Sequence, residues 1–257
     1  MIYGYLDKNI KAQNHREIGG VRIDQHFRVE ELENVQEQYC IPTNATAVVV
    51  HGVLRNNAKV IREATRRGID WYYIDNGYLG TYKRFCKNST APDKVYKGDK
   101  PRFEHNTKFQ KWRGGQGENI IVLPPSPPYM DTFDQRDFLN YCAHNINIYT
   151  GKPIIVRAKP AKGRFAPPWE EQLKNAYCVV TWGSALALDA MIQGVPTISL
   201  GWCPAGPASK QLEDLETNRM LEEPDREAIV NNLTWFSYEK NELSQVWDSV
   251  AEVYETV

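Results

Sequence analysis

The chain has 257 residues, of which 42% are hydrophobic, and its 31 Lys and Arg nearly balance its 32 Asp and Glu, so the formal net charge is −1. The length suits one large or two compact domains, and the hydrophobic content excludes a wholly disordered chain. A net charge near zero gives no global signal for a nucleic-acid partner. The charge is unevenly distributed, however: residues 83–113 hold ten Lys or Arg against three acids, a net charge of +7, and the rest of the chain carries −8.

Cysteine usage and the lack of long apolar runs indicate the cellular context. The five cysteines lie far apart and form no Cys-x-x-Cys pair, so we expect neither a disulfide framework nor a structural zinc site. The first residues lack the basic and then apolar pattern of a signal peptide. No apolar run approaches the roughly 18–20 residues that cross a bilayer. We therefore expect a soluble, cytoplasmic protein.

The first third of the chain predicts a parallel sheet. Strands are expected near 1–6, over 45–51 and over 69–74, and a helix over 56–68 joins the last two. A strand, a helix and a strand within about 30 residues form a βαβ unit, whose strands are parallel. Segment 82–113 shows neither helical nor strand periodicity, so we expect a long loop of the kind that often carries function.

Strands and helices alternate in the second half, which predicts an open doubly wound sheet. The strands are expected over 119–123, 153–157, 177–181 and 195–200. The helices are expected over 134–148, 169–176 and 185–193, after a stiff Pro-rich segment at 124–128, and two acidic helical segments follow at 224–235 and 242–254. We place the boundary between two domains after residue 116: domain 1–116 carries the basic loop 82–113, and domain 117–257 carries the second sheet.

The most specific segment, 179–201, reads VVTWGSALALDAMIQGVPTISLG. A strand ends at Thr181, Gly183 makes a tight turn, and Ser184 stands at the N-cap of the next helix. Free backbone N–H groups and the helix dipole can bind a phosphate there. Asp189, one turn along the helix, is in reach of a sugar hydroxyl. An ordinary αβ unit with a well-capped helix has the same features, so the residues alone leave both interpretations open.

As a whole, this segment resembles the donor-binding segment of glycosyltransferases with the GT-B fold, in particular the capsule polysaccharide synthesis glycosyltransferases. The resemblance covers roughly residues 118–202. It implies two Rossmann-like α/β domains facing a cleft, the N-terminal one minimal, a nucleotide-sugar co-substrate such as a UDP-sugar, and no metal or other cofactor. Ser184 and Ala185 correspond to the diphosphate-binding turn, and Asp189 to the acid that holds the ribose, where the family usually has Glu.

Four cations lie within eight residues after the strand at 153–157. Ligands of open α/β sheets bind beyond the carboxyl ends of strands, so this cluster favours an anion site. Under the resemblance, Arg157 and Lys159 neutralise the diphosphate and the leaving nucleotide. The predicted donor site therefore consists of Arg157, Lys159, Lys162, Arg164, Thr181, Gly183, Ser184, Ala185 and Asp189.

Glycosyl transfer also needs a group that deprotonates or orients the acceptor hydroxyl. Two candidates stand at strand ends in the N-terminal part, Asp75 in the sequence Asp-Asn-Gly and His51. We expect Asp75 to take this role because its carboxylate would lie at the carboxyl edge of the sheet. Asp-Asn-Gly is also ideal turn chemistry, and His51 is the alternative base.

The basic loop interleaves cations with aromatic side chains, a composition that suits a polyanion with bases that can stack. Segment 72–113 loosely resembles bacteriophage glycosyltransferases that add sugars to hydroxymethylated pyrimidines in DNA. This resemblance implies DNA as the acceptor, in the host cytoplasm if the protein is phage-encoded, and a base flipped out of the duplex. The predicted acceptor contacts are Asn76, Tyr78, Lys83, Arg84, Lys108, Lys111, Trp112 and Arg113.

Three other functions are compatible with the same residues. They are a glycosyltransferase that acts on a capsule or lipopolysaccharide glycan, a sugar-nucleotide epimerase, and a nucleic-acid-binding module with a degenerate transferase fold. The sugar, the stereochemistry of transfer and the oligomeric state are left open by the sequence.

Overall fold

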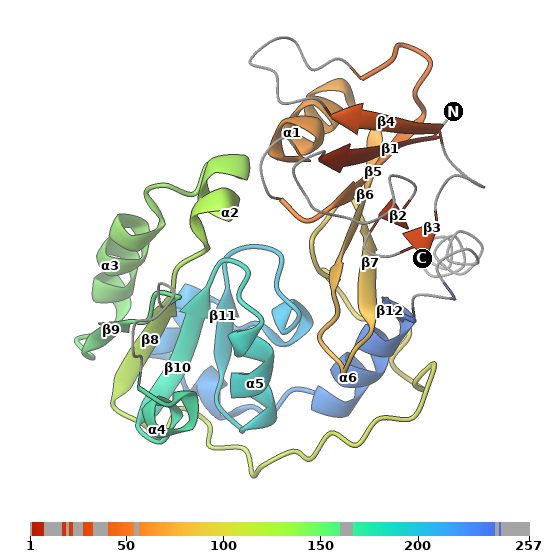
Figure 1. Ribbon diagram of the computed structural model, residues 1–257. Coiled ribbons are helices and arrows are strands. Elements are labelled where there is room, and N and C mark those ends of the chain that lie inside the picture. Colours follow the sequence, from red (N-terminus) through yellow and green to blue (C-terminus); the bar gives the residue numbers. More distant parts are fainter. Residues whose placement is uncertain are drawn as a thin grey trace. The chain divides into compact units, whose positions relative to one another are not determined.

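The computed structural model describes residues 2–7, 17–18, 21–22, 28–32, 41–53, 57–159, 167–239 and 242. Contacts divide the chain into two units (Figure 1). Unit 1 comprises residues 1–90, 128–134 and 233–257, and unit 2 comprises residues 91–127 and 135–232. Each unit combines helices with a sheet that contains parallel strands, which confirms the predicted Rossmann-like α/β class.

The domain boundary differs from the predicted one. The chain passes from unit 1 to unit 2 after residue 90 instead of after 116. The physical reason is that segment 91–116, although it follows unit 1 in sequence, makes its hydrogen bonds with residues of unit 2. The predicted closing helix at 242–254 lies outside the described residues, apart from residue 242.

Unit 1 is built on a six-stranded sheet with the order β12-β7-β6-β5-β1-β4. Its parallel strands are β4 (Arg28–Leu32), β1 (Ile2–Asp7), β5 (Ala47–His51) and β6 (Asp70–Asn76). Helix α1 (Asn57–Arg67) joins β5 to β6 and buries Val60, Ile61 and Ala64 against them. The predicted βαβ unit is therefore confirmed. A short antiparallel pair, β2 (Glu17–Ile18) and β3 (Val21–Arg22), stands apart from this sheet.

Strand β7 (Lys83–Lys87) corrects the prediction of a loop from residue 82. It pairs antiparallel with β6, so that Arg84 stands opposite Asp75, and on its other edge with β12 (Ser237–Tyr238). The hydrophobic pattern did not reveal this strand because one of its buried positions is occupied by a charged residue. Arg84 is only 9% exposed, whereas an arginine is ordinarily expected in solvent. Since β6 continues to residue 76, Asp75 lies near the carboxyl end of a paired strand, and the alternative of a turn at this position does not apply.

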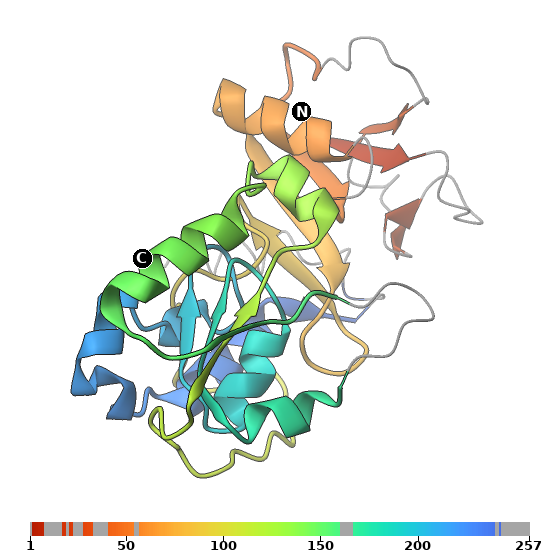
Figure 2. The ribbon, with the colours of Figure 1, turned by 90° about the vertical axis from the view of Figure 1, so that its left-hand side faces the viewer.

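Unit 2 is built on a fully parallel sheet, as predicted. Its strand order is β11-β10-β8-β9. Its strands are β8 (Asn119–Leu123), β9 (Ile154–Val156), β10 (Ala176–Thr181) and β11 (Thr197–Ser199). The connecting helices are α3 (Phe138–Tyr149), α4 (Trp169–Leu173) and α5 (Leu186–Ile192). Helix α3 lies on one face of the sheet, and α4 and α5 lie on the other (Figure 2).

This doubly wound arrangement follows from the strand order. The chain moves outward from β8 to β9 in one direction and from β10 to β11 in the other. Right-handed crossovers that travel in opposite directions place their helices on opposite faces. The strand order therefore reverses between β8 and β10, and ligands of such sheets bind beyond the carboxyl ends of the strands at that point. Eight buried residues, from β8, β10, α4, α5 and the turns beside them, form the core on one face: Ile121, Leu123, Trp169, Leu173, Ala176, Val179, Ala190 and Val195.

The remaining helices are short or lie near the C-terminal end. Helix α2 (Pro127–Thr132) lies partly in the predicted stiff segment, since prolines are tolerated in a first helical turn. Helix α6 (Arg226–Trp235) confirms the first predicted closing helix. Three 3₁₀ helices precede it: η1 (Gly206–Ala208), η2 (Leu212–Glu216) and η3 (Asn218–Leu221).

Residues 91–113, which we call the basic strap, are irregular as predicted but are held firmly within unit 2. The side-chain oxygen of Asn232, on α6, accepts hydrogen bonds from the backbone N–H groups of Tyr96 (2.8 Å) and Lys97 (3.0 Å). Asn231 likewise donates to the backbone carbonyl of Gly98 at 3.1 Å. Both asparagines are buried, so their amides take the place of a strand partner for the strap.

A buried arginine holds the end of the strap. The Arg226 guanidinium donates to the backbone carbonyls of Gln110 (2.9 Å) and Met191 (3.2 Å), and lies 5.1 Å from the centroid of the Phe109 ring. The Met191 carbonyl belongs to the last turn of α5, where a cation is favoured by the helix dipole. The strap is therefore fastened to the C-terminal end of α5.

Candidate active site

The turn after β10 lies where the strand order of unit 2 reverses. The Thr181 hydroxyl donates to the backbone carbonyl of Leu123 at the end of β8 (3.0 Å), and accepts the N–H groups of Gly183 (3.3 Å) and Ser184 (3.1 Å). The Ser184 hydroxyl oxygen accepts the N–H of Leu186 at 3.2 Å. Three of the N–H groups that we expected to be free therefore have partners inside the turn.

Two groups of this turn are left for a ligand. The backbone N–H of Ala185 makes no hydrogen bond within the part of the chain that the structure describes, and Ala185 is exposed. The Ser184 hydroxyl accepts a hydrogen bond but keeps its own hydrogen to donate. Chemically, the turn offers two donors to an anion, fewer than the sequence suggested.

Two glycines allow this turn to pack tightly against the loop after β11. A Cβ atom on Gly183 would stand 2.8 Å from the backbone oxygen of Trp202, and one on Gly201 would stand 2.5 Å from the indole of Trp182. The two indoles themselves meet edge to face, with centroids 5.8 Å apart. The turn and the loop thus form one closely packed wall, in which no larger residue fits at either glycine.

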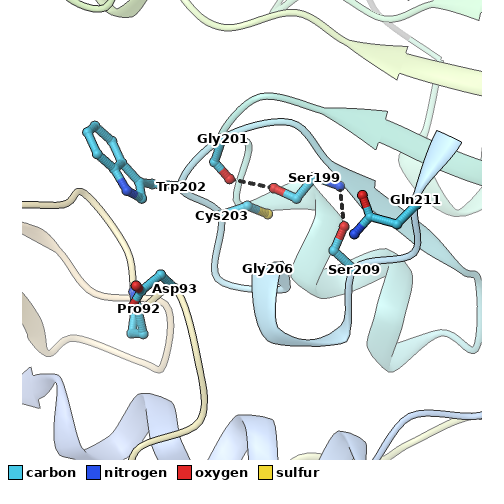
Figure 3. Close-up of a pocket in the computed structure, with 9 residues that line it drawn as sticks. All are labelled: Pro92, Asp93, Ser199, Gly201, Trp202, Cys203, Gly206, Ser209 and Gln211. Carbon is cyan, nitrogen blue, oxygen red and sulfur yellow. Dashed lines mark hydrogen bonds between the residues drawn. The ribbon is translucent and has the colours of Figure 1, made fainter. Parts of the chain in front are cut away.

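A pocket of about 280 Å³ lies beside this wall (Figure 3). Its position at the carboxyl end of β11 follows the rule for ligand sites in open sheets. The Cys203 thiol joins the pocket to the turn, since its sulfur lies 3.5 Å from the backbone oxygen of Ser184. The pocket is lined by Pro92, Asp93, Ser199, Gly201, Trp202, Cys203, Gly206, Ser209 and Gln211.

The pocket's hydrogen bonds hold its shape. The Ser199 hydroxyl donates to the Gly201 carbonyl at 2.6 Å, and the Ser199 N–H donates to the Ser209 hydroxyl at 2.7 Å. Burial raises the pKa of Cys203 to about 11, so its thiol is neutral and unreactive near pH 7. These residues were not predicted from the sequence. The available signal was the run of Gly, Trp, Cys and Pro that directly follows the last predicted strand.

The predicted donor cations differ in what they contact. The Arg157 guanidinium donates to the Pro167 carbonyl at 2.8 Å and to the Gln172 side chain, and lies 5.3 Å from a Trp169 ring centroid. Arg157 is therefore held against α4. Lys159, two residues further, is exposed. Lys162 and Arg164 lie outside the described residues.

Asp189, the predicted ribose contact, lies on the exposed side of α5. Partial burial, together with the negative charge of Glu170 on α4, raises the pKa of Asp189 above its ordinary value. The two carboxylates therefore share one surface of unit 2. A hydrogen-bond donor such as a sugar hydroxyl would relieve the repulsion between them.

In unit 1, Asp75 is the centre of a compact polar cluster. Its Oδ2 atom accepts hydrogen bonds from the Tyr73 hydroxyl (2.6 Å) and the Arg84 guanidinium (3.2 Å), and its Oδ1 atom accepts the N–H of Asn76 (2.7 Å). Arg84 also donates to the hydroxyls of Tyr73 and Tyr129, both at 3.3 Å. The Asp75 side chain is nevertheless 31% exposed, so that a ligand can still reach its carboxylate.

Charge and burial oppose each other in this cluster. Burial disfavours the cationic form of Arg84, but the surrounding tyrosine hydroxyls and Asp75 hold its pKa well above the ordinary value. Burial, with Asp75 and Tyr129 nearby, raises the pKa of Tyr73 well above its ordinary value. The cluster is therefore a buried cation that donates hydrogen bonds to the Asp75 carboxylate and to two phenol hydroxyls.

His51, the alternative base, ends the neighbouring strand β5. Burial lowers its pKa, and this effect outweighs the opposing attraction of Asp75. Its Nε2 atom is buried and has no hydrogen-bond partner in the described structure. The imidazole is therefore neutral near pH 7, but Nε2 is not accessible to an acceptor.

The predicted acceptor residues do not form one patch within either unit. Asn76, Tyr78, Lys83 and Arg84 belong to unit 1, whereas Lys108, Lys111, Trp112 and Arg113 belong to unit 2. Several also have internal partners. In unit 1, Lys83 donates to the Asn76 side chain at 2.6 Å, and the Tyr78 ring lies 4.6 Å from the Arg84 guanidinium.

On the strap, the aromatic and guanidinium groups are occupied and the lysines are not buried. The Trp112 indole N–H donates to the Leu221 carbonyl at 3.1 Å, and the Arg113 guanidinium donates to the Ala176 carbonyl at 3.0 Å. Partial burial lowers the pKa of Arg113. Lys108 and Lys111 are exposed. The strap therefore offers lysine charges on its surface, but Trp112 has a structural role.

Within the described ranges, no group of three or more His, Cys, Asp or Glu side chains is arranged to hold a metal ion. None of the helices that the structure describes is both long and apolar enough to span a bilayer.

Comparison with known proteins finds similarity only among solved structures. No protein-family model matches the chain, and no curated protein sequence is significantly similar to it. One similar structure is the Thermosulfurimonas dismutans KpsC, beta Kdo 2,4 transferase, with 11% identity and a TM-score of 0.43 over 91% of this chain and 90% of that chain. Another is the beta Kdo 2,7 transferase of the same KpsC, with 12% identity and a TM-score of 0.43 over 90% of this chain and 89% of that chain. At this level of similarity, the function has to be inferred from the chain's own residues.

Proposed function

We propose that the protein is a glycosyltransferase that binds a nucleotide-sugar donor in unit 2. The observation that carries this proposal is the turn 181–184, which lies where the order of a parallel sheet reverses and shares a wall with a 280 Å³ pocket. Ligands of open α/β sheets bind at this place. The resemblance of segment 179–201 to the donor-binding segment of GT-B glycosyltransferases supports the same site.

The donor contacts are proposed from the groups that the structure leaves available. The Ser184 hydroxyl and the Ala185 N–H would bind the diphosphate, and the exposed Lys159 would supply positive charge at the end of β9. Asp189, with its raised pKa and its neighbour Glu170, would hold a ribose hydroxyl. Arg157 would support this site indirectly by holding α4 in place.

The proposed base is Asp75 of unit 1. Arg84 donates a hydrogen bond to its carboxylate, and the side chain remains accessible. An accessible carboxylate can accept the proton of an acceptor hydroxyl during transfer. His51 is less suited to this role because its Nε2 atom is buried.

A phosphate-bearing acceptor is proposed from the exposed lysines of the strap, and DNA with hydroxymethylated pyrimidines is the specific candidate. Lys108 and Lys111 are exposed on a segment that the buried asparagines of α6 already order, so little ordering entropy opposes their binding to phosphates. Because Trp112 is bonded within unit 2, stacking on it is not part of the proposal.

Donor binding is tested by isothermal titration of UDP, GDP, CMP and ADP. One of these nucleotides should bind, and both Ser184→Ala and Lys159→Ala should weaken its binding about tenfold, the value of one charge-assisted hydrogen bond. The matched control is Lys174→Ala, which removes an exposed lysine of the same unit that pairs with Glu171 at 2.7 Å. Failure of all four nucleotides to bind, or equal effects of Lys159→Ala and Lys174→Ala, contradicts the proposed donor site.

The acceptor is tested by mass spectrometry of DNA containing hydroxymethylcytosine or hydroxymethyluracil after incubation with a panel of nucleotide sugars. A gain of one sugar mass on the modified base is expected, and affinity for this DNA should fall steeply with salt because phosphate contacts release counterions. Lys108→Ala with Lys111→Ala should reduce the salt slope by about two. Transfer to an oligosaccharide and not to DNA would identify a glycan acceptor instead.

A further inference from the structure

The lining of the unit 2 pocket carries negative charge and, among the described residues, no positive charge. Among the described residues, Asp93 is the charged side chain that lines it, and no Lys, Arg or His does so. Two lysines are neighbours of lining residues in sequence. The ammonium of Lys94 lies 5.1 Å from the centroid of the Tyr96 ring, and that of Lys210 pairs with Glu222 at 3.6 Å. Neither lysine lines the pocket.

Asp93 is held in a defined position by the strap. Its Oδ1 atom accepts a hydrogen bond from the Tyr96 hydroxyl at 2.6 Å, and the Tyr96 N–H is in turn bound by the buried Asn232 at 2.8 Å. An ionised carboxylate can only accept hydrogen bonds. The wall around Asp93 therefore offers acceptors to a ligand.

The opposite side of the pocket is formed by Gln211 (Figure 3). The Gln211 side chain caps the N-terminus of η2 by accepting a backbone N–H, which leaves its amide hydrogens to donate. A ligand with several hydroxyl groups can satisfy both sides, since each hydroxyl donates and accepts. The volume of about 280 Å³ lies just below the range for drug-sized ligands and suits a single sugar ring.

We propose that this pocket holds the sugar of the donor, and that Asp93 selects a neutral or amino sugar over a sugar that bears a carboxylate. The inference rests on the proposed donor site in unit 2. A hydroxyl or ammonium group can donate to Asp93, whereas a sugar carboxylate would meet Asp93 with no lining cation to compensate. Asp93 is exposed, so solvent screens this repulsion, and we expect it to weaken binding by about fivefold.

The test compares UDP, UDP-glucose and UDP-glucuronic acid by isothermal titration, because the two sugars differ only in the oxidation state of one carbon. UDP-glucose should bind about fivefold more tightly than UDP-glucuronic acid. Asp93→Asn should bring this ratio close to one, mainly by tightening the binding of UDP-glucuronic acid, with the affinity for UDP unchanged. Asp99→Asn, which removes an exposed acid of the same strap, should leave the ratio unaltered.

The outcomes separate this inference from the proposed function. If the protein binds UDP but has equal affinity for UDP-glucose and UDP-glucuronic acid, the role of Asp93 is overturned but the donor site is not. The same holds if Asp93→Asn leaves the ratio of these two affinities unchanged. A wild-type protein that does not bind UDP contradicts a UDP-sugar donor, and this inference fails with it.

Discussion

The strand ends of the two units hold their polar groups in opposite ways. In unit 1, one charge is buried where β6 ends and β7 begins: Arg84 lies among Asp75, Tyr73 and Tyr129, and each of these accepts a hydrogen bond from it. In unit 2, the end of β10 and β11 consists of glycines and backbone groups packed into a wall, beside an open pocket with an acid on one side.

The difference separates two tasks. A buried ion pair is costly to desolvate and is retained where it holds a particular geometry, so the cluster in unit 1 suits the positioning of one reactive carboxylate. A rigid backbone wall beside an open pocket suits the binding of a ligand. The following four predictions test whether unit 1 positions a reactive carboxylate and unit 2 binds the ligand.

The largest effect is expected for Asp75→Asn. The amide has nearly the same shape but cannot take a proton from the acceptor, so the rate of sugar transfer should fall at least about 100-fold. Nucleotide binding, which we place in unit 2, should be unchanged. The measurement is the initial rate of transfer together with a nucleotide titration. Asp70→Asn, on the same strand and ion-paired with Lys87 at 2.9 Å, is the control and should retain transfer. Full activity of Asp75→Asn would shift the role to His51.

The next largest effect is expected for Arg84→Met, which leaves Asp75 and two tyrosine hydroxyls without their common donor. Breaking a buried ion pair costs about 3 kcal/mol, and the melting temperature should fall by roughly 6–12 °C. Lys83→Met is the matched control on the same strand. Its partly exposed lysine pairs with Asn76, and its loss should cost less than about 0.5 kcal/mol. If Arg84→Met and Lys83→Met have equal melting temperatures, the cluster around Arg84 does not stabilise unit 1.

A smaller effect on stability is expected for Gly201→Ala in the wall of unit 2. The new Cβ would stand 2.5 Å from the Trp182 indole and 2.6 Å from the Trp182 backbone oxygen, so that the wall has to shift at a cost of about 2 kcal/mol. Nucleotide affinity should fall with it. Gly151→Ala, where no atom lies within 4 Å of the added Cβ, should leave both unchanged. Urea unfolding and nucleotide titration of the two variants provide the test, and an unchanged nucleotide affinity would separate the wall from the binding site.

The smallest effect is expected from the titration of His51. Because burial lowers its pKa in the folded state, the unfolded chain binds more protons as the pH falls below about 6.5, and folding stability is lost in that range. Stability should therefore be full above about pH 6.5 and should decrease below it by less than about 1 kcal/mol. His51→Gln should remove this part of the pH dependence in urea unfolding, whereas His144→Gln, at an exposed position of α3, should preserve it. A pH dependence that survives His51→Gln would show that another group causes it.

Much of the architecture could be predicted from local patterns. Short apolar strands alternating with amphipathic helices predicted the parallel strands of both sheets, and the described strands β5, β8 and β10 lie within a residue or two of their expected positions. The turn at Thr181, Gly183 and Ser184 was likewise recognisable, because the end of a strand, a glycine and a capping residue stand together in sequence. The number of its N–H groups available to a ligand was not predictable, since their partner is the Thr181 hydroxyl.

Unit 1 shows the limit of such patterns. The segment Lys-Arg-Phe-Cys-Lys at 83–87 looks like a charged loop, and becomes a strand because Arg84 meets Asp75 and Tyr73 on the neighbouring strand. The same pairing leaves Asp75 near the carboxyl end of β6, as expected, and excludes the alternative of a turn there. The partners of Arg84 lie on another strand and on α2, so the periodicity of segment 83–87 does not reveal that this charge is buried.

The sequence by itself determined the α/β class, the order of strands and helices, and the glycine turn at the end of β10, because each depends on neighbouring residues. Only the tertiary structure decided that the +7 stretch is divided between two units, that its Arg84 is buried and its strap is fastened by α6, and that Asp93 joins residues 199–211 in one pocket. These outcomes depend on hydrogen bonds and packing between residues far apart in the chain, where burial and pairing outweigh local preference.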